Sequence, residues 1–119
     1  MTTLDIFQTI TDPLTFAAGD TIFRAGDPGD AMFVVTEGEI EIFVHGKILE
    51  TVKGPGGIIG EMALIDTKPR SATALATTAG KMVRVDQARF LFLVQNTPFF
   101  AIEVMQVIVD RLRRMDSVV

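Results

Sequence analysis

The stretch AMFVVTEGEIEIFVHGKILETVKGPGG, residues 31–57, decides the fold class because apolar and polar residues alternate along it. In an extended chain, successive side chains point to opposite faces. The turn residues Gly38, His45-Gly46 and Gly54-Pro55-Gly56-Gly57 interrupt the alternation and predict tight turns between strands. One face of the central strand carries Ile40, Ile42 and Val44, and the other carries Glu39, Glu41 and Phe43.

The same pattern continues on both sides of this stretch. LTFAAGD and TIFRAGDPGD (residues 14–30) precede it, and SATALATTAGKMVRVD (residues 71–86) follows it, each with short apolar runs ended by glycine. Short strands at such regular spacing predict a β-sandwich or β-barrel over about residues 14–86. We interpret four glycines as turn residues without ligand contacts: Gly19, Gly26, Gly29 and Gly38.

Three segments have a helical pattern. After Asp86, a plausible N-cap, apolar residues follow a period of 3.6 and predict a helix over about residues 87–95. A second helix is expected over about residues 98–115, with Thr97 as its N-cap and Pro98 at its first position. An amphipathic helix over residues 3–11 is expected to end before Pro13.

The last helix carries two apolar stripes, and a barrel covers only one of them. The other stripe needs a ligand, a second copy of the chain or an effector to cover it. We therefore expect this helix to move, closing over a bound ligand. The first stripe consists of Ala101, Met105, Ile108, Leu112 and Met115, and the second of Phe100, Val104 and Val107.

The composition excludes several classes of function. Without cysteine, the 119 residues contain no disulfide, zinc-thiolate site or catalytic thiol, which suits a reducing cytoplasm. A net charge of −4 argues against a nucleic-acid surface. Membrane insertion by this chain is not expected either, because no apolar run reaches the roughly 18 residues that a spanning helix needs.

Two opposite charges stand in the apolar stretch IIGEMALIDTKPRSATA, residues 58–74. Because an unpaired buried charge is very costly, Glu61 and Arg70 each need a partner. The segment EMALID is long enough for one helical turn, whose first N–H groups attract an anion. Arg70 offers a rigid fork that binds phosphate, and the small residues Ser71 and Ala72 leave their N–H groups accessible. These groups together fit one phosphate.

Glu61 repels a phosphate, so it suits a hydroxyl donor elsewhere on the same ligand. A ligand with one phosphodiester beside a free hydroxyl is a 3′,5′-cyclic nucleotide, whose ribose keeps its 2′-OH. The residues alone leave an alternative open, in which Glu61 and Arg70 simply form a structural salt bridge.

Gly60-Glu61-Met62-Ala63-Leu64 and Pro69-Arg70-Ser71-Ala72-Thr73 resemble the phosphate-binding cassette of the cyclic-nucleotide-binding domain family. The resemblance covers about residues 10–115. It implies a single domain over residues 1–119, mainly β, with an eight-stranded antiparallel β-roll (jelly roll), an N-terminal helix and two C-terminal helices.

The resemblance also assigns roles to residues. Glu61 is the expected acceptor for the 2′-OH and Arg70 the phosphate clamp. Separately, closure of the last helix is expected to bring Arg111 or Arg113 onto the face of the purine. Ser71 and its apolar surroundings favour cyclic AMP modestly over cyclic GMP. We expect a cytoplasmic regulatory module with no catalysis, no metal and no other cofactor. The expected cradle consists of Gly60, Met62, Ala63, Ser71 and Ala72.

Three alternatives stay open beside this interpretation. A metal-dependent jelly-roll enzyme is disfavoured, since His45 is the only histidine. A regulator of the catabolite-activator type carries a helix-turn-helix after the long helix, and a chain ending at Val119 is expected to leave no room for one. The chain also resembles intracellular domains of bacterial cyclic-nucleotide-gated potassium channels, so it is either a stand-alone protein or one domain of a larger channel, kinase or regulator.

Overall fold

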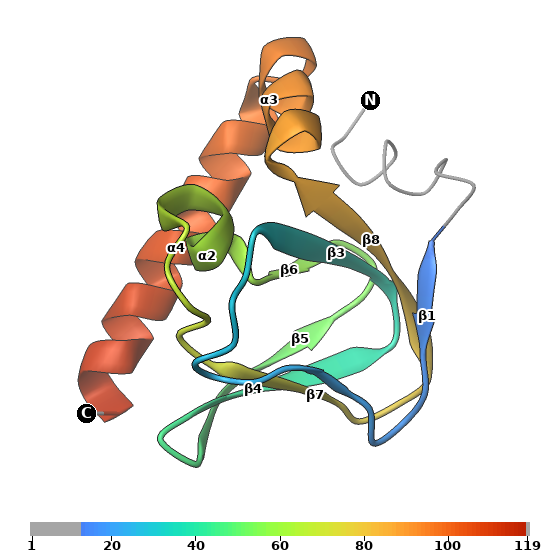
Figure 1. Cartoon of the computed structure of the whole chain (residues 1–119), viewed down its shortest axis with the longest axis vertical. Helices are drawn as coiled ribbons and strands as arrows, with labels where there is room; N and C mark the ends of the chain where they lie inside the picture. Colours follow the sequence, from blue (N-terminus) through green and yellow to red (C-terminus); the bar gives the residue numbers. More distant parts are fainter. Residues whose placement is uncertain (1–12, 119) are drawn as a thin grey trace.

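The computed structural model describes residues 13–118, which form two four-stranded antiparallel sheets and three helices (Figure 1). This confirms the mainly β class and the eight-stranded antiparallel roll with C-terminal helices. The helix expected over residues 3–11 lies outside the described residues. The strands are β1 (Leu14–Phe16), β2 (Thr21–Phe23), β3 (Ala31–Glu37), β4 (Glu39–Val44), β5 (Lys47–Lys53), β6 (Gly57–Ile59), β7 (Thr73–Ala76) and β8 (Gly80–Asp86), and the helices are α2 (Glu61–Asp66), α3 (Gln87–Asn96) and α4 (Phe99–Val118).

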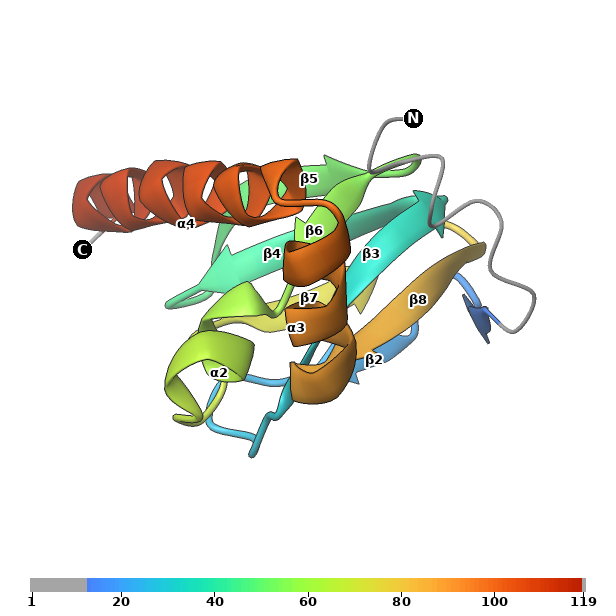
Figure 2. The same ribbon diagram turned by 90° about the horizontal axis from the view of Figure 1, so that it is seen from above.

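The two sheets enclose one core, and the helices cover a second one. The sheet orders are β1-β8-β3-β6 and β2-β7-β4-β5. Ile40, Ile42 and Val44 of β4 are buried, as their alternation predicts. Strand β3 is buried on both faces, because Val35 packs between the sheets while Met32 packs under the helices. Helix α3 lies near β8 and α4 near β5 (Figure 2).

The two C-terminal helices begin and end close to the expected residues. The Asp86 carboxylate accepts a hydrogen bond from the Arg89 N–H at 2.8 Å, so it caps α3 as predicted. Thr97 ends α3, donating its N–H to the Leu93 carbonyl at 2.7 Å, and its own carbonyl accepts the Phe100 N–H at 2.9 Å, so its role as the cap of α4 stays a prediction. Helix α4 begins at Phe99, one residue beyond Pro98. Within residues 13–118, no helix is long and apolar enough to cross a membrane.

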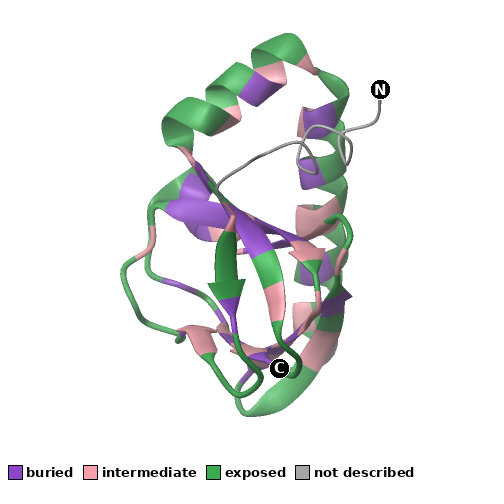
Figure 3. Ribbon diagram, turned by 90° about the vertical axis from the view of Figure 1, so that its right-hand side faces the viewer, coloured by how far each residue is buried: buried purple, intermediate pink, exposed green. Residues whose placement is uncertain are grey.

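Only one of the two stripes on α4 faces the roll throughout. Phe100 and Val104 are fully buried, and the same face continues through Val107 to Arg111. The longer stripe divides: Met105 is 60% exposed and Leu112 50% exposed, although its other members lie closer to the roll. Figure 3 shows this mixture of buried and exposed residues along the helix. Phe100, Val104 and Val107 pack in the core under the helices, and Met105 and Leu112 lie on a different face of α4 that is exposed.

Candidate functional site

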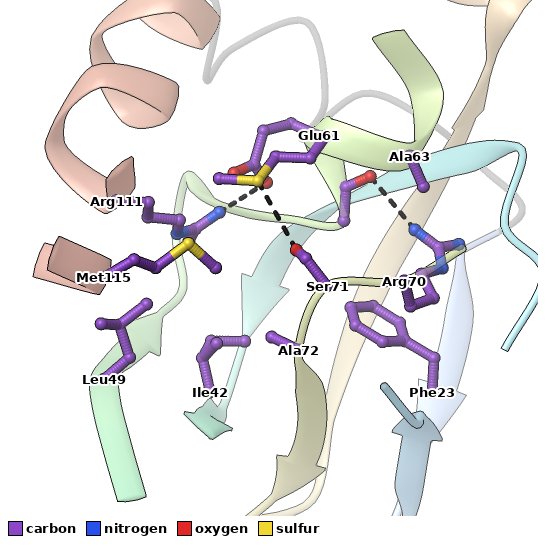
Figure 4. Close-up of a pocket in the computed structure, with 12 residues that line it drawn as sticks. Phe23, Ile42, Leu49, Glu61, Ala63, Arg70, Ser71, Ala72, Arg111 and Met115 are labelled. Atoms are coloured by element: carbon purple, nitrogen blue, oxygen red, sulfur yellow. Dashed lines mark hydrogen bonds and ion pairs between the residues drawn. The ribbon is translucent and has the colours of Figure 1, made fainter. Parts of the chain in front are cut away.

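Every site residue expected from the sequence except Arg113 lines one pocket between α4, α2 and the start of β7 (Figure 4). Arg113 is exposed on α4 and does not line the pocket. Apolar walls come from Met115, a member of the first stripe of α4, and from Phe23 and Leu49, which the sequence analysis did not single out. The expected residues that line it are Gly60, Glu61, Met62, Ala63, Arg70, Ser71, Ala72 and Arg111.

Gly60 starts helix α2 in a backbone conformation that only glycine adopts easily. Its φ is 77°, in the left-handed region, and no side chain caps the helix. A Cβ placed on Gly60 would lie 2.5 Å from Arg70 Nη1. The first N–H groups of an α-helix have no partner within the helix. The residues after Gly60 therefore present uncapped backbone donors at the pocket.

Arg70 is a buried arginine that keeps one donor unused. It is 8% exposed, and its Nη1 donates to the Gly60 carbonyl at 3.1 Å. Its guanidinium carbon lies 4.4 Å from the centroid of the Phe23 ring, a cation–π contact. Its Nε is buried without a hydrogen-bond partner. Burial lowers the pKa of Arg70, and this effect is larger than the increase caused by the acidic groups nearby. An anion at this nitrogen would satisfy it and compensate for the desolvation.

The loop between β2 and β3 positions Arg70. The backbone N–H of Arg70 donates to the Asp27 carbonyl at 2.8 Å, and the Arg70 carbonyl accepts from the Gly26 N–H at 2.9 Å. Gly29 lies against the side chain, where a Cβ would stand 2.3 Å from Arg70 Nε. Gly26 has a positive φ and is a turn glycine, as interpreted, but Gly29 is needed for a different reason. It leaves room for the guanidinium group, and nothing in the sequence distinguishes it from the turn glycines.

Glu61 forms its ion pair with Arg111 of helix α4. Glu61 is 2% exposed, and its Oε2 accepts from Arg111 Nη1 at 2.6 Å. The alternative in which Glu61 and Arg70 form a structural salt bridge is therefore wrong, since Arg70 donates to Gly60 instead.

Arg111 binds three acceptors, and we call Arg111 with these three groups the Arg111 cluster. Besides Glu61, its Nε donates to Glu50 Oε1 at 2.6 Å, and its Nη2 donates to the Ile58 carbonyl. Arg114 adds an ion pair to Glu50 Oε2 at 3.3 Å. Burial alone would lower the pKa of Arg111, but Glu61 and Glu50 outweigh it, so the pKa lies above its ordinary value.

The Arg111 cluster differs from the sequence-based expectation in two ways. The structure brings Arg111 rather than Arg113 into the pocket, and Arg111 is bound to carboxylates rather than placed to stack on a purine. Glu50 was missed altogether, because a glutamate in the strand KILETVK has the appearance of an ordinary surface residue. Among residues 13–118, no group of three His, Cys, Asp or Glu is arranged to hold a metal ion.

Comparison with known proteins agrees with this geometry. The family described as "Cyclic nucleotide-binding domain" matches residues 13–97. The chain is 40% identical over 87 residues to a cyclic nucleotide-gated potassium channel of Mesorhizobium japonicum, covering 73% of this chain and 24% of the channel. It is 28% identical over 109 residues to a CRP-like cAMP-activated global transcriptional regulator of Mycobacterium tuberculosis, covering 88% of this chain and 49% of the regulator.

Among solved structures, the catabolite activator protein of Thermus thermophilus superposes with a TM-score of 0.77 at 30% identity, covering 95% of this chain and 53% of that protein. The chain spans less than half the length of the potassium channel and of the cAMP-activated regulator.

Proposed function

The chain belongs to the cyclic nucleotide-binding domain family, and on this premise we propose that it binds cyclic AMP as a non-catalytic regulatory module. The observation that carries the proposal is the arrangement of Arg70. It is buried and fixed by Gly60 and Phe23, yet its Nε has no partner. An unsatisfied buried donor costs about 1–3 kcal/mol, which a phosphate oxygen would recover.

The groups around Arg70 extend this phosphate site. The uncapped start of α2 follows Gly60 directly, and Ser71 and Ala72 follow Arg70 in the same pocket. Glu61, next to Gly60, is the acceptor we assign to the ribose 2′-OH. One compact phosphodiester and an adjacent hydroxyl would therefore be bound from consecutive residues of one segment.

The walls of the pocket support a preference for adenine over the more polar guanine. Ile42, Leu49 and Met115 line it with apolar surface. The Ser71 hydroxyl donates to the sulfur of Met62 at 3.5 Å, a weak acceptor. One relative is named as a cAMP-activated regulator, which agrees with this choice. Competition between cyclic AMP and cyclic GMP for the protein tests it, and tighter binding of cyclic GMP would contradict it.

The regulatory role rests on relatives named as a cyclic nucleotide-gated potassium channel and a cAMP-activated transcriptional regulator. We propose that residues 1–119 act as a single domain in the cytoplasm. The exposed apolar side chains of α4 give it a surface for a second copy of the chain or an effector. They include Ile102, Met105, Val109 and Leu112.

Titration calorimetry with cyclic AMP tests the proposed function. We expect Arg70→Ala to weaken binding by at least about thirtyfold, because truncating a buried charged partner costs about 2–5 kcal/mol and each 1.4 kcal/mol is tenfold. Arg24→Ala is the matched control: it removes an exposed arginine next to the loop that holds Arg70. Absence of binding by the unaltered protein, or equal losses in both variants, would reject the proposal.

A further inference from the structure

The Arg111 cluster ties α4 to the pocket through groups of the protein alone. Its acceptors come from three elements: Glu50 from β5, Ile58 from β6 and Glu61 from α2. We propose that this cluster shuts the pocket, that a nucleotide binds only after Arg111 has left Glu61, and that Glu50 is the positioning residue that sets this balance. The inference rests on the proposed function of the pocket.

The size of the pocket requires such a movement. Its cavity volume is about 30 Å³. Small-molecule sites occupy about 300–1,000 Å³, so the pocket as it stands is too small for a nucleotide. Figure 4 shows Arg111 and Met115 of α4 reaching into it beside Leu49, on the side away from Arg70. The phosphate end of the site is thus preformed, whereas the opposite end is filled by side chains of α4.

A ribose hydroxyl and Arg111 would compete for the Glu61 carboxylate. The guanidinium of Arg111 is a charged donor at 2.6 Å from the Glu61 carboxylate. A ribose hydroxyl is a neutral donor, and charge-assisted hydrogen bonds are roughly twice as strong as neutral ones. A hydroxyl therefore does not displace Arg111 without an additional driving force. That force would come from the phosphate on Arg70, which lies at the other end of the pocket.

Glu50 determines how firmly Arg111 is held, yet it is absent from the lining of the pocket. Its two carboxylate oxygens contact Arg111 and Arg114, at 2.6 Å and 3.3 Å. The Glu50 side chain is 19% exposed, so solvent screens these ion pairs only partly. Glu50 acts on the ligand through Arg111 and α4, and its effect should therefore appear in the rate of binding.

The test compares Glu50→Gln with the unaltered protein in two measurements. Hydrogen exchange without nucleotide should quicken over residues 107–112 of α4. Stopped-flow binding of fluorescently labelled cyclic AMP should show an association rate constant raised about tenfold, since one charge-assisted contact is lost. Glu39→Gln is the matched control, because Glu39 pairs with Lys53 at 3.7 Å on the neighbouring strand and both side chains are exposed.

The outcomes separate this inference from the proposed function. Unchanged exchange, or an association rate that stays equal or falls in Glu50→Gln, overturns the inference even if cyclic AMP binds the unaltered protein. If exchange is faster but the protein does not bind cyclic AMP, the proposed function is rejected. The Arg111 cluster would then still be what holds α4 against the pocket. Should Glu50→Gln fail to fold, Glu50→Asp keeps the charge and shortens the side chain by one methylene, with a smaller change expected in the same direction.

Discussion

Replacing Arg111 by methionine should destabilise the fold by leaving Glu61 as a buried carboxylate without its cation. Glu61 is 2% exposed, so water does not replace the lost contact at 2.6 Å. Breaking a buried ion pair by removing one partner costs about 3–5 kcal/mol. Glu50 contributes less to this loss, because Arg114 still pairs with it at 3.3 Å. The expected fall in the free energy of unfolding therefore arises mainly from Glu61.

A second substitution tests this explanation. Adding Glu61→Gln to Arg111→Met removes the buried charge, and the double variant should regain more than half of the lost stability. Urea unfolding followed by circular dichroism measures both variants, since the chain has no Trp or Tyr for fluorescence. At about 4 °C per kcal/mol, the single variant should melt roughly 12–20 °C lower.

Arg24→Met provides the control for this pair of variants, because Arg24 is an exposed arginine outside the Arg111 cluster. Exposed substitutions usually change stability by less than about 0.5 kcal/mol. A loss below about 1 kcal/mol in Arg111→Met would refute the reasoning, as would a double variant no more stable than the single one.

Three further predictions concern the pocket and its support. Gly29→Ala should lower cyclic AMP affinity about tenfold in calorimetry, about 1.4 kcal/mol, because the new Cβ displaces the Arg70 guanidinium; an unchanged affinity would show that Arg70 adapts. Ser71→Thr should move the preference toward cyclic GMP in competition binding, because β-branching restricts χ1 and would hold the hydroxyl ready to accept from the exocyclic amine of guanine, and a stronger preference for cyclic AMP would contradict this. Asp86→Ala should cost about 1 kcal/mol in urea unfolding through loss of the N-cap, and a change below about 0.3 kcal/mol would mean that the cap contributes little.

Local patterns of residues predict the fold well because they are set by one segment at a time. Alternation around Ile42 places β4, and the change of period after Asp86 places the start of α3. The helix stripes were less predictable, since spacing alone does not show which stripe meets the roll. The stripe from Phe100 faces it through apolar packing against distant strands and through Arg111, whose two carboxylate partners lie 61 and 50 residues away in sequence.

The residues of the candidate site also fall into two groups, those that the sequence predicts and those that it does not. Glu61 and Arg70 are found from the sequence because the glycines and small residues around them are contiguous with them. Glu50 and Gly29 are not, because their roles depend on contacts with side chains from other elements. Glu50 has the appearance of a surface residue on a strand, and Gly29 has the appearance of a turn residue. Pairings between distant segments carry no local signal.

The pairing of β3 has a consequence for how this chain acquires its structure. Strand β3 lies between β6 and β8 in its sheet, and Ala31 of β3 pairs with Asp86 of β8. Domains dominated by such long-range pairings fold in milliseconds to seconds, because loop closure precedes the stabilising contacts. During synthesis, β3 cannot obtain its β8 neighbour until residue 86 has left the ribosome. The two-sided core around Met32 and Val35 therefore forms late, and the apolar strands made first stay exposed to other chains until then.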